Sequence, residues 1–438
     1  MTLRFGTDGV RGPASEFTDA LVIALGQAAA QVLGSSSFVI GRDTRESGDR
    51  IERALATGLA QVGAQPLSMG VVPTPAVAWV CAQRGVPGAV ISASHNPWSD
   101  NGIKFFAAGG RKLSDELEDA LESALDTIVA TGIDSPAIAD IGTDTEVVGE
   151  WCDAVSSSVS SIAPMRIVID CANGAASSVA PGIFRGLGLE VDVLHAQPDG
   201  RNINDACGST HPEDLQRAVV ENGAALGLAF DGDADRLLAV DERGELVDGD
   251  QLIALFARDL RERGELAGDR VVVTVMSNLG FRLAMDAQGI EVVETPVGDR
   301  HVLEALARTS SSLGGEQSGH IVFADRATTG DGVLSGVQLV DLVGRSQTPL
   351  SVLADGVMER LPQVLRNIRL EHRRDDIADA IAREIAEVEQ SLGARGRVLI
   401  RLSGTEPLVR VMVEAPTLPQ AEAAADNLAA AVIQACSA

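Results

Sequence analysis

Three stretches of the chain share one pattern of apolar and polar positions. In residues 38–72, 166–194 and 270–296, a β-branched apolar run is followed by a polar loop, a segment with helical apolar spacing, a glycine and a second apolar run. The pattern predicts strand, helix and strand in each stretch. Units of this kind build parallel sheets covered by helices, so we expect three related α/β domains. The helices are expected to end near the glycines Gly63, Gly188 and Gly289.

The last part of the chain has a different pattern. Residues 375–392 have the apolar spacing of a helix, residues 396–415 are typical of two strands around a polar loop, and residues 419–435 form an alanine-rich helical stretch. This order predicts a small α+β domain. The polar stretches 134–145 and 361–367 are the expected linkers.

Composition narrows the class of protein. The 438 residues are too many for one ordinary core, and 45% hydrophobic and 22% charged residues are typical of a globular protein. A formal net charge of −27 argues against nucleic acid and anionic membranes as partners, and it requires a locally positive site for any anionic substrate. Five scattered cysteines without a Cys-x-x-Cys pair favour a reducing compartment. With no apolar leader or membrane-length run, we expect a cytoplasmic protein.

A serine and a histidine lie side by side where an apolar run ends, in the stretch AVISASHNPWSDNGIKFF (residues 89–106). A serine hydroxyl beside an imidazole suggests a nucleophile with its base. Catalytic pairs usually meet through space, however, and Asn96 before Pro97 is also ordinary turn chemistry. Lys104 lies beyond an Asn-Gly turn that could fold it back towards Ser94.

Three aspartates alternate in the stretch GLAFDGDADRLLAVD (residues 227–241), directly after an apolar run. Three carboxylates at this spacing repel one another unless a cation lies among them. With Glu242 they also match positions 1, 3, 5 and 12 of a Ca²⁺-binding loop, but Arg236 stands where that loop needs glycine, and the flanks predict strands instead of helices. We expect a divalent metal, Mg²⁺ rather than Ca²⁺, with a solvated acidic turn as the alternative. The expected ligands are Asp231, Asp233 and Asp235.

Two later loops carry polar residues at regular spacing. In GGEQSGHIVF (residues 314–323), a glutamate and a serine suit sugar hydroxyls or an amine, and a histidine titrates near neutral pH. In RLSGTEPLVR (residues 401–410), hydroxyls, backbone N–H groups and two arginines form a plausible nest for a phosphate. A surface turn and a plain hairpin are the respective alternatives. The candidate residues are Glu316, Ser318, His320, Arg401, Ser403, Gly404, Thr405 and Arg410, with weaker signals at Arg11, Asp299 and Arg300.

Taken in order, these loops resemble one family. The motifs GTDGVRG, ISASHNPWSDNGIKFF, DGDADR, GGEQSGH and SGTEPLVRVMVE are similar to those of the α-D-phosphohexomutases, and the resemblance covers essentially the whole chain. It implies an α/β fold of four domains around a central cleft, each contributing one loop. The expected domains are 1–150 with the phosphoserine loop, 151–250 with the metal loop, 251–364 with the sugar-binding loop and 365–438 with the phosphate-binding loop.

The resemblance also implies a reaction. Ser94 would be the phosphoserine that donates and reclaims a phosphoryl group, and its phosphate would complete the Mg²⁺ site. The motif wording is most similar to the branch of the family that acts on glucosamine phosphates, with glucosamine 1,6-bisphosphate as intermediate and activator. That branch supplies precursors of UDP-N-acetylglucosamine and the cell wall. The expected partner is a small phosphosugar, and the expected assembly is a monomer or homodimer.

Further roles are carried over residue by residue. Lys104 and His320 match positions of proton transfer, and Arg11 and Arg236 would stabilise the charge of the phosphoryl group. Sugar and phosphate binding is expected from Glu316, Ser318, Asp299, Arg300, Arg401, Ser403, Gly404, Thr405 and Arg410. Leu402 departs from the family pattern, in which we expect proline, and this puts the rigidity of the phosphate loop in question.

Other functions remain open at this point. The same scaffold could act as a phosphoglucomutase or phosphomannomutase. A metal-dependent sugar phosphatase and a non-catalytic sugar-phosphate binder are the alternatives from other classes. The serine, lysine and aspartate set argues against the binder, because such a protein needs no nucleophile.

Overall fold

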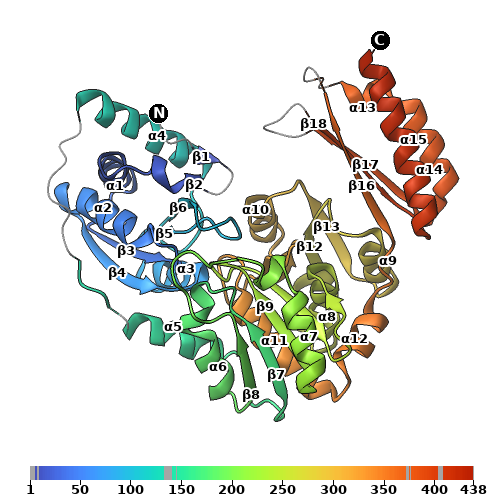
Figure 1. Cartoon of the computed structure of the whole chain (residues 1–438), viewed down its shortest axis with the longest axis horizontal. Coiled ribbons are helices and arrows are strands. Elements are labelled where there is room, and N and C mark those ends of the chain that lie inside the picture. The colour runs from blue at the N-terminus through green and yellow to red at the C-terminus, as the bar shows by residue number, and fades with distance from the viewer. Residues whose placement is uncertain are drawn as a thin grey trace. The chain divides into compact units, whose positions relative to one another are not determined.

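The computed structural model describes residues 5–6, 9–132, 141–144, 146–370, 374, 376–402 and 408–437. Contacts divide the chain into two compact units. The larger unit contains Met1–Val275 and Glu291–Ala354, and the smaller contains Met276–Ile290 and Asp355–Ala438. Three sheets belong to the larger unit and one to the smaller (Figure 1).

The first sheet has the strand order β1-β2-β6-β5-β3-β4. Its strands are β1 (Phe5–Gly6), β2 (Gly9–Pro13), β3 (Ser37–Arg42), β4 (Gln65–Val71), β5 (Gly88–Ile91) and β6 (Asp100–Phe106), and its helices are α1 (Asp19–Leu33), α2 (Gly48–Gln61), α3 (Thr74–Arg84) and α4 (Asp115–Thr131). Phe38 and Ile40 of β3 join the core formed with α1, α2 and α4. A Cβ on Gly41 would instead overlap Val77 of α3, so helices cover both faces.

The second and third sheets follow the same plan. The second has the order β11-β10-β9-β7-β8 and the third the order β13-β12-β14-β15. Their strands are β7 (Arg166–Asp170), β8 (Glu190–Leu194), β9 (Leu226–Phe230), β10 (Leu237–Asp241), β11 (Leu246–Val247), β12 (Arg270–Thr274), β13 (Glu291–Thr295), β14 (Leu313–Gly315) and β15 (Ile321–Phe323). Their helices are α5 (Glu146–Ser156), α6 (Ala180–Gly186), α7 (Glu213–Asn222), α8 (Gly249–Glu262), α10 (Asp299–Thr309), α11 (Gly332–Ser346) and α12 (Leu350–Val357).

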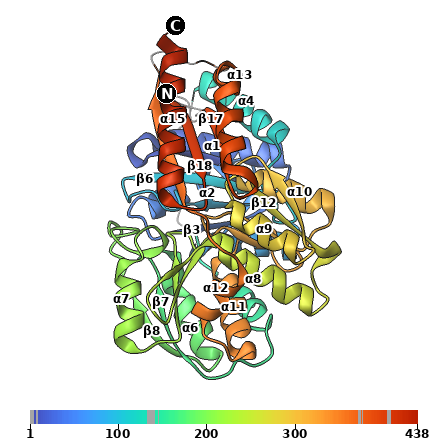
Figure 2. The same ribbon diagram turned by 90° about the vertical axis from the view of Figure 1, so that its right-hand side faces the viewer.

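The fourth sheet is antiparallel, with the order β16-β18-β17. Its strands are β16 (Gln363–Arg369), β17 (Arg397–Leu402) and β18 (Leu408–Glu414), and the helices of this unit are α9 (Leu279–Ala287), α13 (Ile377–Ala380), α14 (Ala382–Leu392) and α15 (Leu418–Ser437). Helices α14 and α15 lie side by side in both views (Figures 1 and 2). Short 3₁₀ turns of the described chain are Ala14–Glu16, Ala175–Ser178, Gly208–Thr210, Ala267–Asp269 and, in the smaller unit, Gly393–Arg395.

The predicted fold class is confirmed, and two details of the prediction are wrong. Each of the three repeated stretches forms a parallel strand pair, namely β3 with β4, β7 with β8 and β12 with β13. Residues 361–367, expected as a linker, instead lie largely in strand β16, which pairs with β18 along its whole length. The single helix expected over 375–392 is divided at Ile381 into α13 and α14.

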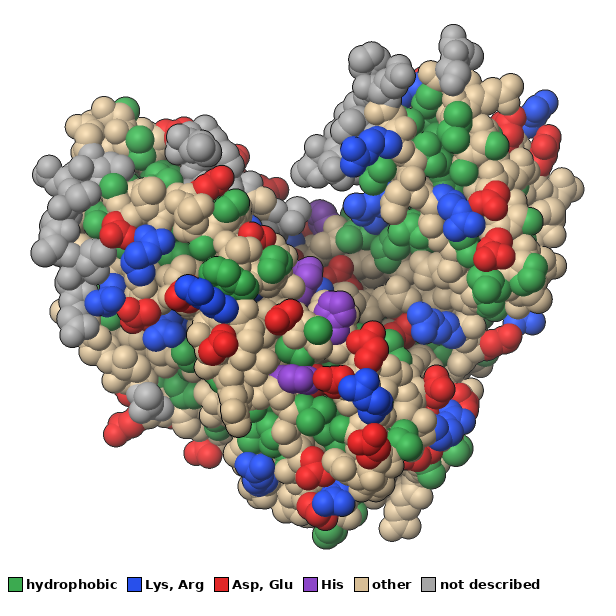
Figure 3. All heavy atoms as spheres, viewed as in Figure 1, with side chains coloured by type: hydrophobic (Ala, Val, Ile, Leu, Met, Phe, Trp, Pro, Cys, Tyr) green, Lys and Arg blue, Asp and Glu red, His purple; other side chains and the backbone are tan. Residues whose placement is uncertain are grey.

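The surface carries charges of both signs. On the face shown in Figure 3, acidic and basic side chains are interspersed. Among the residues described, no helix combines the length and the apolar character needed to cross a membrane.

Helices α1 and α2 approach closely because each has a glycine at the crossing. A Cβ on Gly58 would overlap the Ile23 carbonyl oxygen, and one on Gly26 would overlap the Leu55 carbonyl oxygen. We expect Gly58→Ala to lower the free energy of unfolding by about 2 kcal/mol, because the helices would have to separate. Gly149→Ala in α5 is the matched control, since a Cβ there has open space and alanine favours the helix. Denaturant unfolding of both variants measures the difference, and equal stabilities would contradict the close-packing argument.

Candidate active site

Ser94 lies in the turn between β5 and β6, with a backbone φ of +52°. This left-handed conformation is uncommon for a residue other than glycine. The turn is fixed by hydrogen bonds, because Ser94 N donates to Ser92 Oγ at 2.9 Å and Asn96 N donates to Ala93 O at 3.1 Å. Ser92 Oγ in turn donates to Asp43 Oδ2 at 2.7 Å. The strand end therefore presents Ser94 in one defined orientation.

The Ser94 hydroxyl points at the aspartate loop. Its Oγ donates to Asp231 Oδ2 at 2.7 Å, although the two residues are 137 positions apart. The neighbouring His95 Nδ1 is 3.4 Å from the same Oγ. Burial and the positive charges of Arg236 and Arg11 lower the pKa of His95, which keeps its imidazole neutral at pH 7. The nucleophile candidate is thus held by a carboxylate from the next sheet.

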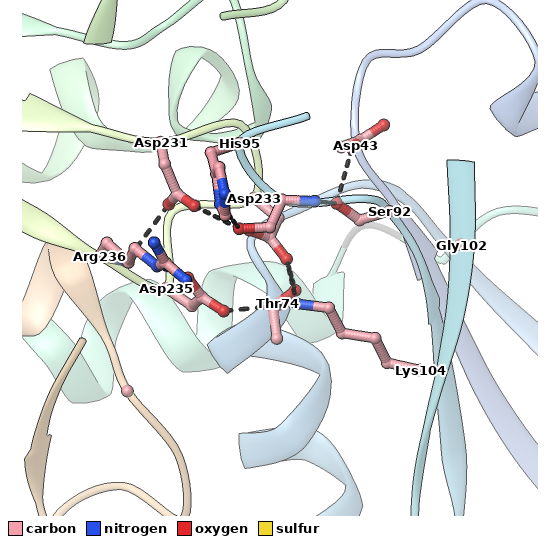
Figure 4. A network of polar contacts seen from close by, with 12 residues as sticks. Asp43, Thr74, Ser92, His95, Gly102, Lys104, Asp231, Asp233, Asp235 and Arg236 are labelled. Atoms are coloured by element: carbon pink, nitrogen blue, oxygen red, sulfur yellow. Dashed lines mark hydrogen bonds and ion pairs between the residues drawn. The ribbon is translucent and has the colours of Figure 1, made fainter. Parts of the chain in front are cut away.

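The three aspartates converge in the loop between β9 and β10 (Figure 4). Lys104, on β6, donates to Asp233 Oδ2 at 2.8 Å and lies 3.4 Å from Asp235 Oδ2. Thr74, the first residue of α3, donates its hydroxyl to Asp233 Oδ2 at 2.6 Å. The buried Lys104 ammonium and the N-terminal end of α3 therefore face Asp233.

The surroundings shift the pKa values of Asp231 and Asp233 in opposite directions. Burial, together with the Asp235 and Asp233 carboxylates, raises the pKa of Asp231 well above its usual range. Burial would also raise the pKa of Asp233, but the Lys104 ammonium and the Lys104 and Thr74 hydrogen bonds hold it below its usual range. Lys104 is therefore the internal counter-charge for Asp233, whereas burial and the two neighbouring carboxylates dominate at Asp231.

Orphaned oxygens show that this cluster fits a metal ion. Among the described residues, Asp233 Oδ1 and Asp235 Oδ1 are buried without a hydrogen-bond partner. Buried polar atoms are normally satisfied, so these two oxygens need a ligand. Three hard carboxylate oxygens are the donors that Mg²⁺ or Ca²⁺ prefers. The Ca²⁺-loop alternative is excluded by geometry, because the flanks are strands and Glu242 accepts hydrogen bonds from Ser351 instead.

A second trio with metal-ligand chemistry lacks this property. Donor atoms of Asp170, His195 and Cys207 lie within 4.8 Å of one another. Asp170 Oδ1, however, accepts from Ala172 N at 2.8 Å, and Oδ2 accepts from Gly208 N at 3.0 Å and from His195 Nδ1 at 2.9 Å. Burial raises the pKa of the Cys207 thiol to about 12, so the thiol stays protonated. The trio is a satisfied hydrogen-bond centre.

The predicted sugar loop brings His320 next to the aspartate loop. His320 Nε2 accepts from Gly330 N at 3.2 Å, and a Cβ on Gly330 would lie 2.8 Å from the Asp235 carbonyl oxygen. Because Nε2 accepts, the ring proton lies on Nδ1, a buried atom without a partner among the described residues. In the same loop Ser318 is exposed, and half-buried Glu316 accepts from Gly298 N at 3.3 Å.

Asp299 and Arg300 form ion pairs with residues 112–118 of the first sheet's domain. Asp299 pairs with Lys112, and its Oδ2 lies 3.8 Å from His320 Nε2. Arg300 pairs with Asp115 and with Glu118, the latter at 2.7 Å. Asp299 is thus beside His320, whereas Arg300 is engaged with α4.

The two remaining arginines among the predicted site residues of the larger unit, Arg11 and Arg236, lie near the aspartates. Arg11, on β2, pairs in register with Gly102 of β6, and its charge lowers the pKa values of His95 and Asp233. Arg236 N donates to Asp231 Oδ1 at 3.3 Å, and its Nε lies 3.8 Å from Asp235 Oδ1. Together with Lys104, both arginines supply positive charge to the three carboxylates.

In the smaller unit, Arg401 of β17 is directly opposite Arg410 of β18. Burial and the neighbouring Arg410 lower the pKa of Arg401. Like charges opposite each other destabilise a strand pair, and an anion between them would remove the repulsion. The predicted residues Ser403, Gly404 and Thr405 lie outside the described part of the chain.

Several residues at the site were not identified from the sequence. Arg45 and Asn204 both donate to the Ser94 carbonyl oxygen at 2.9 Å, and Thr74 and Asp43 support Asp233 and Ser92. Each reaches its partner across 49 to 159 positions, so no local motif marks it. A local hint existed only for Thr74, which precedes a proline at a helix start.

Four family models match consecutive parts of the chain. All describe phosphoglucomutase/phosphomannomutase domains. They are alpha/beta/alpha domain I over residues 2–131, domain II over 148–244, domain III over 248–361 and the C-terminal domain over 365–431.

Relatives match over nearly their full length. A phosphoglucosamine mutase of Moorella thermoacetica is 49% identical, covering 95% of this chain and 96% of the relative. One of Streptomyces avermitilis is 50% identical, covering 98% of each. Among solved structures, a phosphoglucomutase/phosphomannomutase family protein of Burkholderia thailandensis is similar with a TM-score of 0.79 at 24% identity, covering 98% of this chain and 97% of that one. An Aspergillus fumigatus N-acetylphosphoglucosamine mutase, solved with GlcNAc-6P and magnesium, has a TM-score of 0.70 at 18% identity, covering 100% and 96%.

Proposed function

Since the chain belongs to the phosphoglucomutase/phosphomannomutase family and is about half identical to phosphoglucosamine mutases, we propose that it interconverts glucosamine 6-phosphate and glucosamine 1-phosphate. The observation that carries this proposal is the Ser94 hydroxyl, held 2.7 Å from Asp231 in a cluster with two orphaned carboxylate oxygens. A buried hydroxyl at a metal-competent cluster suits a phosphoryl carrier.

The proposed reaction has two transfers. In the first, the free hydroxyl of the sugar monophosphate attacks the phosphorus on Ser94. The new sugar O–P bond forms, the P–Oγ bond breaks, a base of the site takes the proton of the attacking hydroxyl, and Ser94 Oγ takes up a proton from an acid of the site as it leaves. In the second, Ser94 Oγ loses its proton and attacks the other phosphate of the bisphosphate, whose sugar oxygen leaves and takes up a proton. Atoms and charge balance, and the enzyme returns to its phosphorylated form.

Residues of the larger unit would supply the chemistry. Asp231, Asp233 and Asp235 would hold Mg²⁺, which when bound neutralises charge on the phosphoryl group. Lys104 and His320 are proposed for proton transfer, and His320 Nδ1 is a buried ring nitrogen without a hydrogen-bond partner among the described residues. The further residues proposed for charge stabilisation and sugar contact are Arg11, Arg236, Glu316, Ser318, Asp299 and Arg300.

Binding of the phosphate that is not transferred is assigned to the smaller unit. The opposed pair Arg401 and Arg410 is the described part of this site, and Ser403, Gly404 and Thr405 would add hydroxyl and backbone donors. A fixed phosphate site serves both isomers, because the bisphosphate can present either end to Ser94.

A substrate panel tests the proposed function. Glucosamine 6-phosphate, glucose 1-phosphate and mannose 1-phosphate are each supplied with Mg²⁺ and a trace of the matching bisphosphate. We expect the highest kcat/KM for glucosamine 6-phosphate. Faster turnover of a glucose or mannose phosphate would reassign the substrate within the family, release of inorganic phosphate as the main product would indicate a phosphatase, and no turnover would indicate a binding protein.

Arg401→Gln should weaken binding of both isomers equally. The contact is the same in ground and transition states, so KM should rise about tenfold, the equivalent of ~1.4 kcal/mol, with little change in kcat. Arg366→Gln is the matched control, because Arg366 lies on β16 of the same sheet and pairs with exposed Asp426. Steady-state kinetics in both directions measure the effect. Impairment towards one isomer alone would mean that the loop contacts one end of the sugar.

A further inference from the structure

Two side chains from different parts of the larger unit donate hydrogen bonds to the same two backbone oxygens, those of Ser94 and Asn96. Arg45 Nη2 donates to Ser94 O at 2.9 Å and to Asn96 O at 2.8 Å. Asn204 Nδ2 donates to Ser94 O at 2.9 Å and to Asn96 O at 3.2 Å. Each carbonyl thus receives two donors, which is the full capacity of its lone pairs.

These hydrogen bonds are made at Ser94, where the backbone is strained. A left-handed conformation at a residue other than glycine costs on the order of 1–3 kcal/mol and persists only when its surroundings hold it. At Ser94 that conformation directs the hydroxyl to Asp231. Arg45 cannot move easily, because its side chain is fully buried and its Nε binds Asp43 Oδ2 at 2.9 Å. Asn204 is itself left-handed, with a φ of +58°, which asparagine tolerates.

Asn204 also touches the aspartate loop. A Cβ on Gly232, between the first two aspartates, would lie 2.5 Å from Ser94 O and 2.8 Å from Asn204 Nδ2. Only a glycine therefore allows the aspartate loop to lie this close to the serine carbonyl. The Asn204 amide therefore lies where the Ser94 turn meets the aspartate loop, and these two loops must meet for phosphoryl transfer.

The segment that carries Asn204 is anchored at both ends. Asn204 N donates to Ala172 O at 2.9 Å. Asp170, at the end of β7, accepts from Gly208 N on one side of Asn204 and from His195 on the other. The hydrogen bonds of Asp170, which leave no free oxygen for a metal, thus fix the loop between β8 and α7.

We propose that Asn204 is a positioning residue for phosphoryl transfer, whose side-chain amide holds the Ser94 carbonyl and so keeps the Oγ on Asp231. The inference rests on the proposed phosphoserine chemistry. No hydrogen bond of the Asn204 side chain goes to a residue proposed to bind the sugar or the distal phosphate, among those described. Loss of the amide should therefore lower kcat and leave KM nearly unchanged, because misplacing a reacting group by about 1 Å costs roughly 10²-fold.

Two variants separate the amide from other effects. Asn204→Asp keeps the shape and the left-handed backbone but removes the donors, and Asn204→Gly removes the side chain without adding charge. Asn202→Asp is the matched control, because Asn202 lies in the same loop and bonds only within it and to Asn173, as far as the described residues show. We expect a fall in kcat of about tenfold to hundredfold in both Asn204 variants, KM within about threefold, and wild-type values for Asn202→Asp.

A second readout does not depend on the physiological sugar. Unphosphorylated enzyme is mixed with glucose 1,6-bisphosphate and Mg²⁺, and intact mass follows the appearance of one phosphoryl group on Ser94. Slower phosphorylation in both Asn204 variants, with unchanged melting temperature, supports the proposal. An unchanged rate in Asn204→Gly, or a raised KM at constant kcat, overturns it. A wild-type enzyme that phosphorylates Ser94 normally but ignores glucosamine phosphates would instead overturn only the proposed substrate.

Discussion

Ser94→Ala is expected to abolish interconversion of the sugar phosphates, with kcat lowered by on the order of 10⁴-fold or more. The variant loses the atom that accepts and returns the phosphoryl group, so no other residue of the cluster can replace it. Alanine meets the same backbone strain as serine, and the four hydrogen bonds to the carbonyls of residues 94 and 96 remain. We therefore expect a folded protein with nearly unchanged melting temperature.

Ser99→Ala is the control for this variant. Ser99 lies in the same loop, but it is exposed, and no side-chain hydrogen bond is seen for it among the described residues. Peptide mapping of the wild type after treatment with a bisphosphate should place the phosphate on Ser94 and not on Ser92, whose hydroxyl is committed to Asp43. Normal turnover by Ser94→Ala would refute the assignment of the nucleophile.

Asp233→Asn is expected to weaken Mg²⁺ binding and activity together. The substitution removes one of three carboxylate ligands and also the partner of Lys104, which lies 2.8 Å away. We expect Mg²⁺ affinity to fall by about tenfold to hundredfold, with a comparable loss of rate at limiting Mg²⁺ that excess Mg²⁺ partly restores. Calorimetric titration with Mg²⁺ and rates over a range of Mg²⁺ concentrations measure the two quantities.

Asp241→Asn provides the matched comparison for the metal site. Asp241 is also buried and ends the neighbouring strand β10, but its oxygens bind Arg243 and the backbone of residue 245. Its Mg²⁺ affinity should equal that of the wild type. A loss of activity in Asp233→Asn with unchanged Mg²⁺ affinity would show that the carboxylate acts only through Lys104.

The sequence predicted the parts of the site that are local. The Ser94 turn and the aspartate loop each follow an apolar strand, and their residue types and spacing indicated a candidate hydroxyl nucleophile and a candidate cation site. Asn204 and Arg45 could not be found this way, because they act on backbone oxygens 110 and 49 positions away. A side chain that binds a carbonyl oxygen leaves no pattern of residue types at the position it supports.

The wrong prediction of a linker over residues 361–367 has a similar explanation. Strand β16 is at the edge of its sheet and exposes three of its seven residues, so charged side chains interrupt the apolar alternation and give it the composition of a linker. Its pairing with β18, about 45 residues later, becomes visible only in the folded chain.

Helix α9 makes the smaller unit discontinuous in sequence. Its residues group with Asp355–Ala438, whereas β12 and β13 on either side of it group with the larger unit. The Asn278 side chain is joined to Leu361 by two hydrogen bonds, and Leu279 N donates to Glu414 Oε2. Recombination between related genes near residue 360 would therefore separate α9 from the residues that bind it, Leu361 and Glu414. A transferable C-terminal module has to include Met276–Ile290 as well.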